Sequence, residues 1–214
     1  MRACQKGLTA LTICVGIATP AFACQGLLAG SPPQLNEDFR NPDIGWGKPD
    51  QTASYTQNGL VLRPPPNQSA WRWNQNFAMA RADLCVEVIN PTPLPTPANA
   101  QTVGDVGAWF WGKDGQNFFT ATISLDGTAA VDRLVNGIWQ VIVPPTRTSA
   151  VRTAAGGVNE IEVVVNGDAG TLYVNGSRVA DFHGQAPPGG GPPGVYGESG
   201  PDGTAWVFTR VLLY

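Results

Sequence analysis

Polar and apolar residues alternate along the segment 159–182, a pattern typical of strands that bury one face. Within it, Asn175-Gly176 suits a two-residue hairpin turn, because both residues of that turn need positive φ angles. The pattern predicts two consecutive hairpins in which Tyr173 pairs with Glu162 and with Arg178. These three residues should form an exposed polar ladder. The inward-facing set is apolar and consists of Ile161, Val163, Leu172, Val174 and Val179, with Leu172 opposite Val163 and Val179.

The same alternation predicts another hairpin over residues 106–125, with its turn at residues 113–116. Pairing Gly112 with Asn117 places a uniformly apolar set on one face, which we expect in the core. The opposite face then carries aromatic rings among threonines. It consists of Trp109, Trp111, Phe118, Thr120 and Thr122.

About a dozen short strands with regularly spaced turn signals follow one another along the chain, and no stretch after the leader shows a sustained helical period. This predicts an all-β protein, a two-sheet antiparallel sandwich of the jelly-roll type. Residues 1–23 read as a leader, residues 24–36 as a Gly/Pro-rich lead-in, and residues 37–214 as one domain of a size that supports a real core.

The leader has the three parts of a secretory signal peptide. Arg2 and Lys6 are basic, residues 8–18 are apolar, and residues 21–23 form a small-x-small cleavage site. We therefore expect a secreted or periplasmic protein. No later stretch approaches the roughly 20 apolar residues of a transmembrane helix.

Two cysteines, Cys24 and Cys85, follow the leader. In an oxidising compartment they can form a disulfide that links the lead-in to the strand carrying Cys85. The alternative is that Cys24, at the cleavage point, is lipidated and anchors the protein to the cell envelope. Residues 21–24 resemble a bacterial lipobox only loosely, and the sequence leaves both alternatives open.

The formal net charge is −3, and removal of the leader takes away two basic residues and no acidic ones. No cluster of Lys and Arg could neutralise several phosphates, so nucleic acid is excluded as a partner.

Motifs between residues 117 and 182 resemble those of the concanavalin A-like lectin/glucanase (laminin G-like) jelly rolls, and most closely the 3-keto-disaccharide hydrolase-like group. The resemblance implies the jelly-roll fold and a glycoside hydrolase acting on 3-keto-disaccharides or glucans. Members of that group usually end in a strand with Phe-Asp-Asp-Phe, whereas residues 207–211 here read Val-Phe-Thr-Arg-Val. The motifs that carry the resemblance are Asn117-Phe118, Asp126-Gly127, Asn136-Gly137-Ile138-Trp139, Asn159 and Tyr173-Val174-Asn175-Gly176.

Hydrolysis of a glycosidic bond needs two carboxyl groups about 5–9.5 Å apart. The glucanases of this superfamily place theirs on one strand as Glu-x-Asp-x-Glu, and this chain lacks that motif. Asp83, Glu87 and Asp105 are the weak catalytic candidates. Asp83 and Glu87 share a strand face, but their Cα atoms lie roughly 13 Å apart at about 3.3 Å per residue. Glu162 is better explained by an ion pair with Arg178.

His183 is the only histidine, which excludes a His-rich zinc site, and no cofactor is required by any motif. Jelly rolls of this type often hold calcium with carboxylates and backbone carbonyls, so the resemblance allows a calcium ion.

Three functions remain open. Tryptophan suits the flat C–H faces and hydroxyl rims of sugars, and seven tryptophans exceed what this core requires, which favours a non-catalytic glycan-binding protein. The alternatives are the hydrolase and a structural or interaction module of the cell envelope. If instead residues near Trp46, Trp71 and Trp73 cover the aromatic face of the 106–125 hairpin, that face is a second, minor core.

Overall fold

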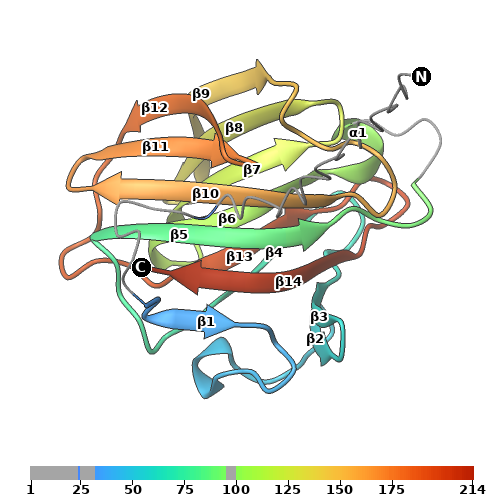
Figure 1. Ribbon diagram of the computed structural model, residues 1–214, viewed down its shortest axis with the longest axis horizontal. Helices are drawn as coiled ribbons and strands as arrows, with labels where there is room; N and C mark the ends of the chain where they lie inside the picture. Colours follow the sequence, from blue (N-terminus) through green and yellow to red (C-terminus); the bar gives the residue numbers. More distant parts are fainter. Residues whose placement is uncertain (1–23, 25–31, 95–99) are drawn as a thin grey trace, which may run out of the picture.

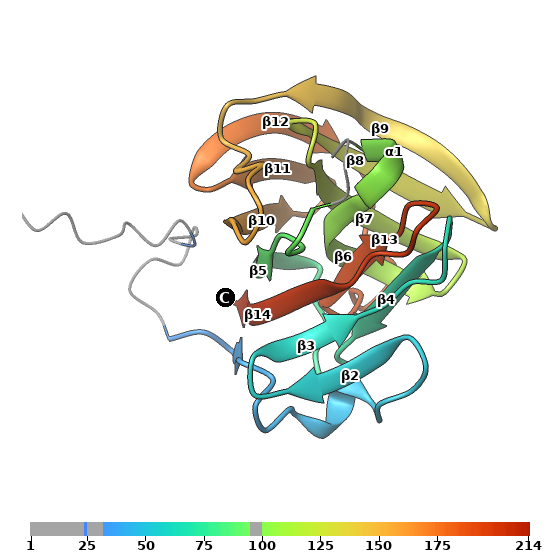
Figure 2. The same ribbon diagram turned by 90° about the vertical axis from the view of Figure 1, so that its right-hand side faces the viewer.

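The protein is a sandwich of two antiparallel sheets, which confirms the jelly-roll architecture expected from the sequence. A computed structural model describes residues 24, 32–94 and 100–214, so the leader expected at residues 1–23 lies outside the described residues. Figure 1 shows one sheet in front of the other, and Figure 2 shows the two layers from the side.

The first sheet has the order β12-β11-β10-β5-β14-β3-β2, and β1 also pairs with β14. Its strands are β1 (Leu35–Glu37), β2 (Ala53–Thr56), β3 (Gly59–Leu62), β5 (Arg81–Ile89), β10 (Val158–Asn166), β11 (Ala169–Val174), β12 (Ser177–His183) and β14 (Trp206–Leu213).

The second sheet has the order β4-β13-β6-β7-β8-β9. Its strands are β4 (Ser69–Trp73), β6 (Asp105–Asp114), β7 (Asn117–Ser124), β8 (Thr128–Val135), β9 (Ile138–Arg147) and β13 (Gly194–Glu198). Two short helices, η1 (Ile44–Trp46) and α1 (Ala100–Val103), lie in the connections. The apolar sides of both sheets face one another and form the main core.

The β10–β11–β12 hairpins largely follow the predicted register. Tyr173 pairs with Glu162 and with Arg178, and the turn residues Asn175 and Gly176 have φ angles of 48° and 77°. The predicted pairing of Leu172 with Val179 is wrong, because a bulge shifts the register and Leu172 pairs with Ala180. The turn residues Asn175 and Gly176 determine where the hairpin turns, but they give no indication of a bulge farther along the strands.

The polar ladder on this sheet is not the exposed one we expected. Glu162 is only 5% exposed, and Arg178 pairs with Asp181 instead of with Glu162. The neighbour of Glu162 is Asp83 on β5. Burial and the nearby Asp83 charge raise the pKa of Glu162 to about 8, and burial raises the pKa of Asp83.

In the β6–β7 hairpin the predicted register holds for Trp109 opposite Thr120, but it fails closer to the turn. Asp114, not Gly112, pairs with Asn117, so residues 111–113 bulge out of the ladder. Trp111 adopts a φ of 47° in this bulge, and its ring turns into the main core. The expectation that Trp111 shares the outer face with Phe118 is therefore wrong.

A disulfide joins Cys24 to Cys85 on β5, with their Cα atoms 5.9 Å apart. This is the first of the two alternatives left open by the sequence. It attaches the start of the described chain to the middle of the first sheet (Figure 1).

Two buried asparagines, Asn90 and Asn159, and the partly buried Asn175 hold the long loop between β9 and β10 against the first sheet. Asn159 on β10 accepts from the Arg152 amide at 2.9 Å and donates to Asn90 at 3.0 Å and to the Arg152 carbonyl at 2.9 Å. Asn175 in the β11–β12 turn donates to Asn159 at 2.9 Å and to the Ala150 carbonyl at 2.7 Å. Each amide thus satisfies backbone groups that would otherwise be buried without partners.

We predict that Asn159→Ala lowers the free energy of unfolding by roughly 2–3 kcal/mol, because it leaves several buried partners unsatisfied. Urea unfolding monitored by fluorescence measures the loss. Asn58→Ala in the exposed β2–β3 turn is the matched control and should cost under about 0.5 kcal/mol. Equal losses in the two variants would contradict a central role for the asparagine network.

Candidate functional site

The outer face of the second sheet is strongly concave. Trp139 on β9 and Tyr196 on β13 have ring centroids only 6.1 Å apart, although β6, β7 and β8 lie between their strands. Neighbouring strands in a flat sheet are about 4.8 Å apart, which would separate these two strands by roughly 19 Å. The sheet must therefore curl toward this side, as Figure 2 shows for the long strand β9.

Aromatic rings fill the floor of this concave face. Trp109 is 1% exposed and stacks on Trp73 of β4, with centroids 4.9 Å apart and planes 17° apart. Phe118 lies 5.5 Å from Trp109 and 5.6 Å from Trp139. Gly112 is required here, because a Cβ atom at that position would meet the Trp109 ring at 1.7 Å. The floor is thus a second small core, as the covered alternative predicted for this face.

Above this floor, the concave face presents partly exposed apolar side chains. Trp139 is 46% exposed and Val141 is 64% exposed on the edge strand β9. Trp71 and Trp73 on the opposite edge strand β4 are partly buried and pack on the floor. A molecule resting on this face would contact tryptophan rings from both edges of the sheet.

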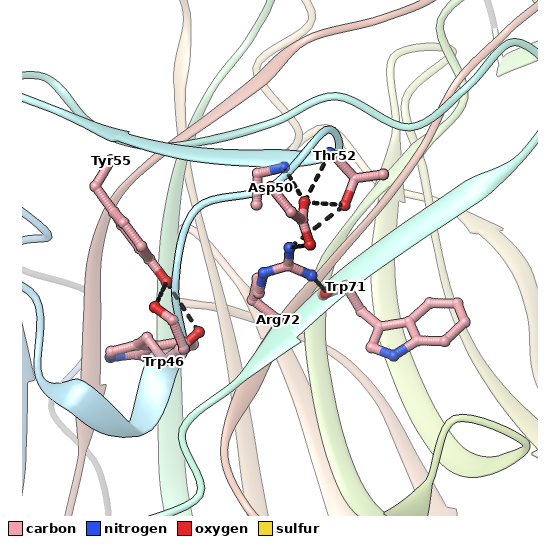
Figure 3. A network of polar contacts seen from close by, with 8 residues as sticks. Trp46, Asp50, Thr52, Tyr55, Trp71 and Arg72 are labelled. Carbon is pink, nitrogen blue, oxygen red and sulfur yellow. Dashed lines mark hydrogen bonds and ion pairs between the residues drawn. The ribbon is translucent and has the colours of Figure 1, made fainter.

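The edge strand β4 is held in place by Arg72, whose side chain points away from the concave face (Figure 3). Arg72 pairs with Asp50 and donates to the Trp71 carbonyl at 3.0 Å. Asp50 also accepts from the Thr52 amide at 2.7 Å, which ties β4 to the loop before β2. Since side chains alternate along a strand, this anchor directs Trp71 and Trp73 to the concave face.

Three carboxyl groups share the concave face with the aromatic rings. Gly197 pairs with Val106, so Glu198 on β13 and Asp105 on β6 are the next residues of the two strands and lie side by side. Asp132 on β8 is opposite Thr120. The Tyr196 hydroxyl donates to Glu198 at 2.7 Å.

The environment of Asp105 and Asp132 disfavours the ionisation of these two carboxyl groups. Burial, together with the charge of Glu198, raises the pKa of Asp105 to about 7 and that of Asp132 to about 6. Burial and the Glu198 charge also raise the pKa of Tyr196. Near neutral pH this face therefore offers carboxyl groups in both protonation states, which can donate as well as accept hydrogen bonds.

The sequence placed fewer than half of these residues on one face. Trp109, Phe118, Thr120, Thr122 and Asp105 do lie together on the concave face, while Trp111 lies in the main core. Trp71 and Trp73 were expected near this face only in the alternative in which it is covered, and they do pack on it. Asp132, Trp139, Tyr196 and Glu198 were missed as members of the same face. The sequence shows how these residues alternate with apolar neighbours within each strand, but it does not show the order in which the strands lie in the sheet.

Asp83 and Glu87 lie on the other sheet, so the structure does not bring them together with Asp105. Glu87 pairs in register with Glu160 and with Arg210. These three residues line a cavity of about 340 Å³ beside the Cys24–Cys85 disulfide.

Among residues 24, 32–94 and 100–214, no group of three or more His, Cys, Asp or Glu side chains is arranged to hold a metal ion. In the same part of the chain, no helix is long and apolar enough to cross a membrane.

No protein-family model matches the chain, and no curated protein matches its sequence. Solved structures match in fold. A carbohydrate-binding module, CBM66 from Bacillus subtilis, superposes with a TM-score of 0.62 at 16% identity, over 78% of this chain and 93% of the module. A β-glucanase from Bacillus licheniformis superposes with a TM-score of 0.54 at 14% identity, over 86% of this chain and 98% of the glucanase. LamAcat from Zobellia galactanivorans superposes with a TM-score of 0.55 at 10% identity, over 86% of this chain and 98% of LamAcat.

At such low identity these similarities show the fold alone. The concanavalin A-like jelly roll expected from the sequence is confirmed. The finer resemblance to the 3-keto-disaccharide hydrolase-like group stays a prediction.

The raised pKa of Asp105 predicts that the protein loses stability as the pH rises. Its carboxyl ionises at about 7 in the folded state, against an ordinary 3.8, so folding favours the protonated form. The penalty is absent below pH about 4 and complete above pH about 7. Asp105→Asn should remove this penalty. A pKa shift of this size corresponds to about 4 kcal/mol of stability before solvent screening. We therefore expect the stability of the variant, relative to the unmodified protein, to be roughly 2 kcal/mol greater at pH 8 than at pH 4.

Urea unfolding of both proteins across this pH range measures the effect. Asp202→Asn, at an exposed carboxyl, is the control and should leave the pH profile unchanged. A profile that is the same in Asp105→Asn and in the unmodified protein would contradict the assignment.

Proposed function

We propose that the concave face of the second sheet binds a glycan. The observation that carries this proposal is the curvature of the sheet, which gathers tryptophans from both edge strands above an aromatic floor and beside three carboxyl groups. Partly exposed aromatic surface of this kind marks binding sites more often than structural ones.

The chemistry of the face suits a sugar. The exposed ring of Trp139 and the partly buried ring of Trp71 would stack on the apolar C–H faces of pyranose or furanose rings. Asp132 and Asp105 would accept or donate hydrogen bonds at the hydroxyl rim, because burial raises the pKa of both carboxyl groups toward neutral pH, and Glu198 adds a third carboxyl group. The fold is also that of a Bacillus subtilis carbohydrate-binding module, which supports the proposal without showing it.

The site of action we propose is outside the cytoplasm, in the periplasm or in the medium, because residues 1–23 read as a secretory leader. The disulfide supports this setting, since disulfides persist in oxidising compartments. A lipid anchor would need the same Cys24 sulfur that the disulfide uses, so we place the soluble form first.

Glycoside hydrolysis is the second candidate. Glu198 and Asp105 lie side by side on neighbouring strands, where Cβ atoms are about 4.5–5.5 Å apart, and such spacing is compatible with a retaining pair. Asp105, with a pKa of about 7, would be the general acid, and Glu198 the nucleophile. The fold likeness to β-glucanases supports this candidate too. Activity on 3-keto-disaccharides and a role as an envelope module stay predictions.

Glycan binding predicts that Trp139→Ala weakens affinity about tenfold, because the variant removes a half-exposed stacking ring and leaves the floor intact. Affinity electrophoresis on a polysaccharide panel, followed by calorimetry on the best ligand, measures the loss. Tyr173→Ala, on the outer face of the other sheet, should bind normally. Retention on no polysaccharide, or equal retention of both variants, would contradict the proposal.

Hydrolysis predicts release of reducing sugar from a glycoside panel that includes oxidised disaccharides, and its loss by at least about 10³-fold in Glu198→Gln. Glycan binding should survive in that variant, because the aromatic rings remain. A purified protein that binds a glycan but cleaves nothing is a binding protein only.

A further inference from the structure

A cavity of about 280 Å³ borders the aromatic floor of the concave face, because Phe118 and Leu134 belong to both. The turn after β6, the end of β8 and the loop between β12 and β13 surround it. Trp111, Phe119 and Pro187 contribute apolar walls. The cavity exists because the bulge at residues 111–113 turns the Trp111 ring inward beneath this loop.

The charged side chains that line the cavity are both cationic. Lys113 and Arg133 contribute their charges, Asn117 and Gln185 add neutral polar groups, and no carboxylate is part of the lining. The chain as a whole carries a net charge of −3, so a pocket with two cations and no acid departs from the average surface. Lys113 and Arg133 are therefore the residues that would attract an anion to this cavity.

Arg133 keeps its hydrogen-bonding capacity for a ligand. Its guanidinium lies over the Phe119 ring at 5.1 Å, a contact that covers one flat face but uses none of the five N–H donors. Within the described part of the chain, Arg133 makes no ion pair, in contrast to Arg72, which pairs with Asp50. A forked donor held in place by an aromatic ring is well suited to two oxygens of one anion.

Lys113 lines the same cavity as Arg133, and the hydrogen bonds to its acidic neighbour Asp114 come from other groups. The Asp114 carboxylate beside it accepts from the Gln116 amide at 2.8 Å and from the Asn117 side chain at 2.9 Å, so it serves the turn. Lys113 is exposed at its end, which leaves its ammonium group free to approach an anion in the cavity.

We propose that this cavity binds a small ligand with one oxyanion, a carboxylate or a phosphate, on a flat ring-sized body. Arg133 takes the anion as a fork, Lys113 adds a point charge, and the apolar walls cover the ring. The proposal does not rest on glycan binding, although the cavity shares Phe118 and Leu134 with the floor of the concave face.

Benzoate, phenyl phosphate and the neutral, isosteric benzamide test the proposal directly. The indole N–H of Trp111 has no partner in the described structure and serves as a reporter in NMR titrations, assigned by its loss in Trp111→Phe. Benzoate or phenyl phosphate should shift this signal with saturation, and benzamide should bind at least about tenfold more weakly. Raising the salt to about 0.2 M should weaken only the anions.

Lys113→Gln and Arg133→Gln should each weaken anion binding several-fold, while Arg40→Gln removes the same charge from an exposed position elsewhere and should have no effect. Lys113 lies at a turn, so its variant tests the site even if Arg133→Gln fails to fold. Trp139→Ala should bind the anions normally, which separates this site from the glycan site. Equal binding of benzoate and benzamide, no saturable binding of any of the three, or equal effects of Lys113→Gln and Arg40→Gln would overturn the proposal.

Discussion

The stacking of Trp109 on Trp73 is the contact on which the concave face depends. It joins the third strand of the second sheet to its edge strand β4, across β13, and it is possible only because Gly112 leaves room for the Trp109 ring. Phe118 and Tyr196 continue this layer to Trp139 on the far edge. Curvature, ring exposure and the approach of the carboxyl groups all follow from this packed layer, so the binding surface and its support are one structure.

Buried carboxyl groups occur on both sheets of the sandwich, but their surroundings differ. On the first sheet, Glu162 and Asp83 are in contact and the pKa of each is raised, with the disulfide cysteine Cys85 on the same strand. On the second sheet, Asp105 and Asp132 lie on the concave face that also carries the exposed Trp139. Both sheets therefore carry carboxyl groups with raised pKa values, but in different surroundings. Only the concave face of the second sheet offers a ligand both aromatic rings and hydrogen-bonding groups.

Local patterns predicted much of the fold, because turn chemistry and alternation are encoded within a few residues. Asn175-Gly176 gave the correct hairpin, and the alternation in β6 and β7 separated core from outer residues up to Phe110. The bulges near Val179 and Trp111 were missed, since an extra residue in a ladder leaves no signal in hydrophobic periodicity. The wrong Glu162–Arg178 pair has a different origin: the register was correct, but register does not reveal which side chains become buried.

The candidate site was predicted only within single hairpins. Trp109, Thr120 and Thr122 belong to one hairpin and were placed together. Glu198 and Asp105 lie almost a hundred positions apart in the chain and meet because β13 inserts between β4 and β6. Strand order of this kind depends on long connections, and no short motif encodes it.

The placement of β14 has a consequence for how the chain reaches its native state. This strand comes last in sequence, yet it lies between β5 and β3 and also pairs with β1. A chain that emerges with its N-terminus first must therefore hold β1, β3 and β5 without their shared partner until residues 206–213 are available. Such non-local closure is slow, and the order of the strands makes completion of the first sheet a late step.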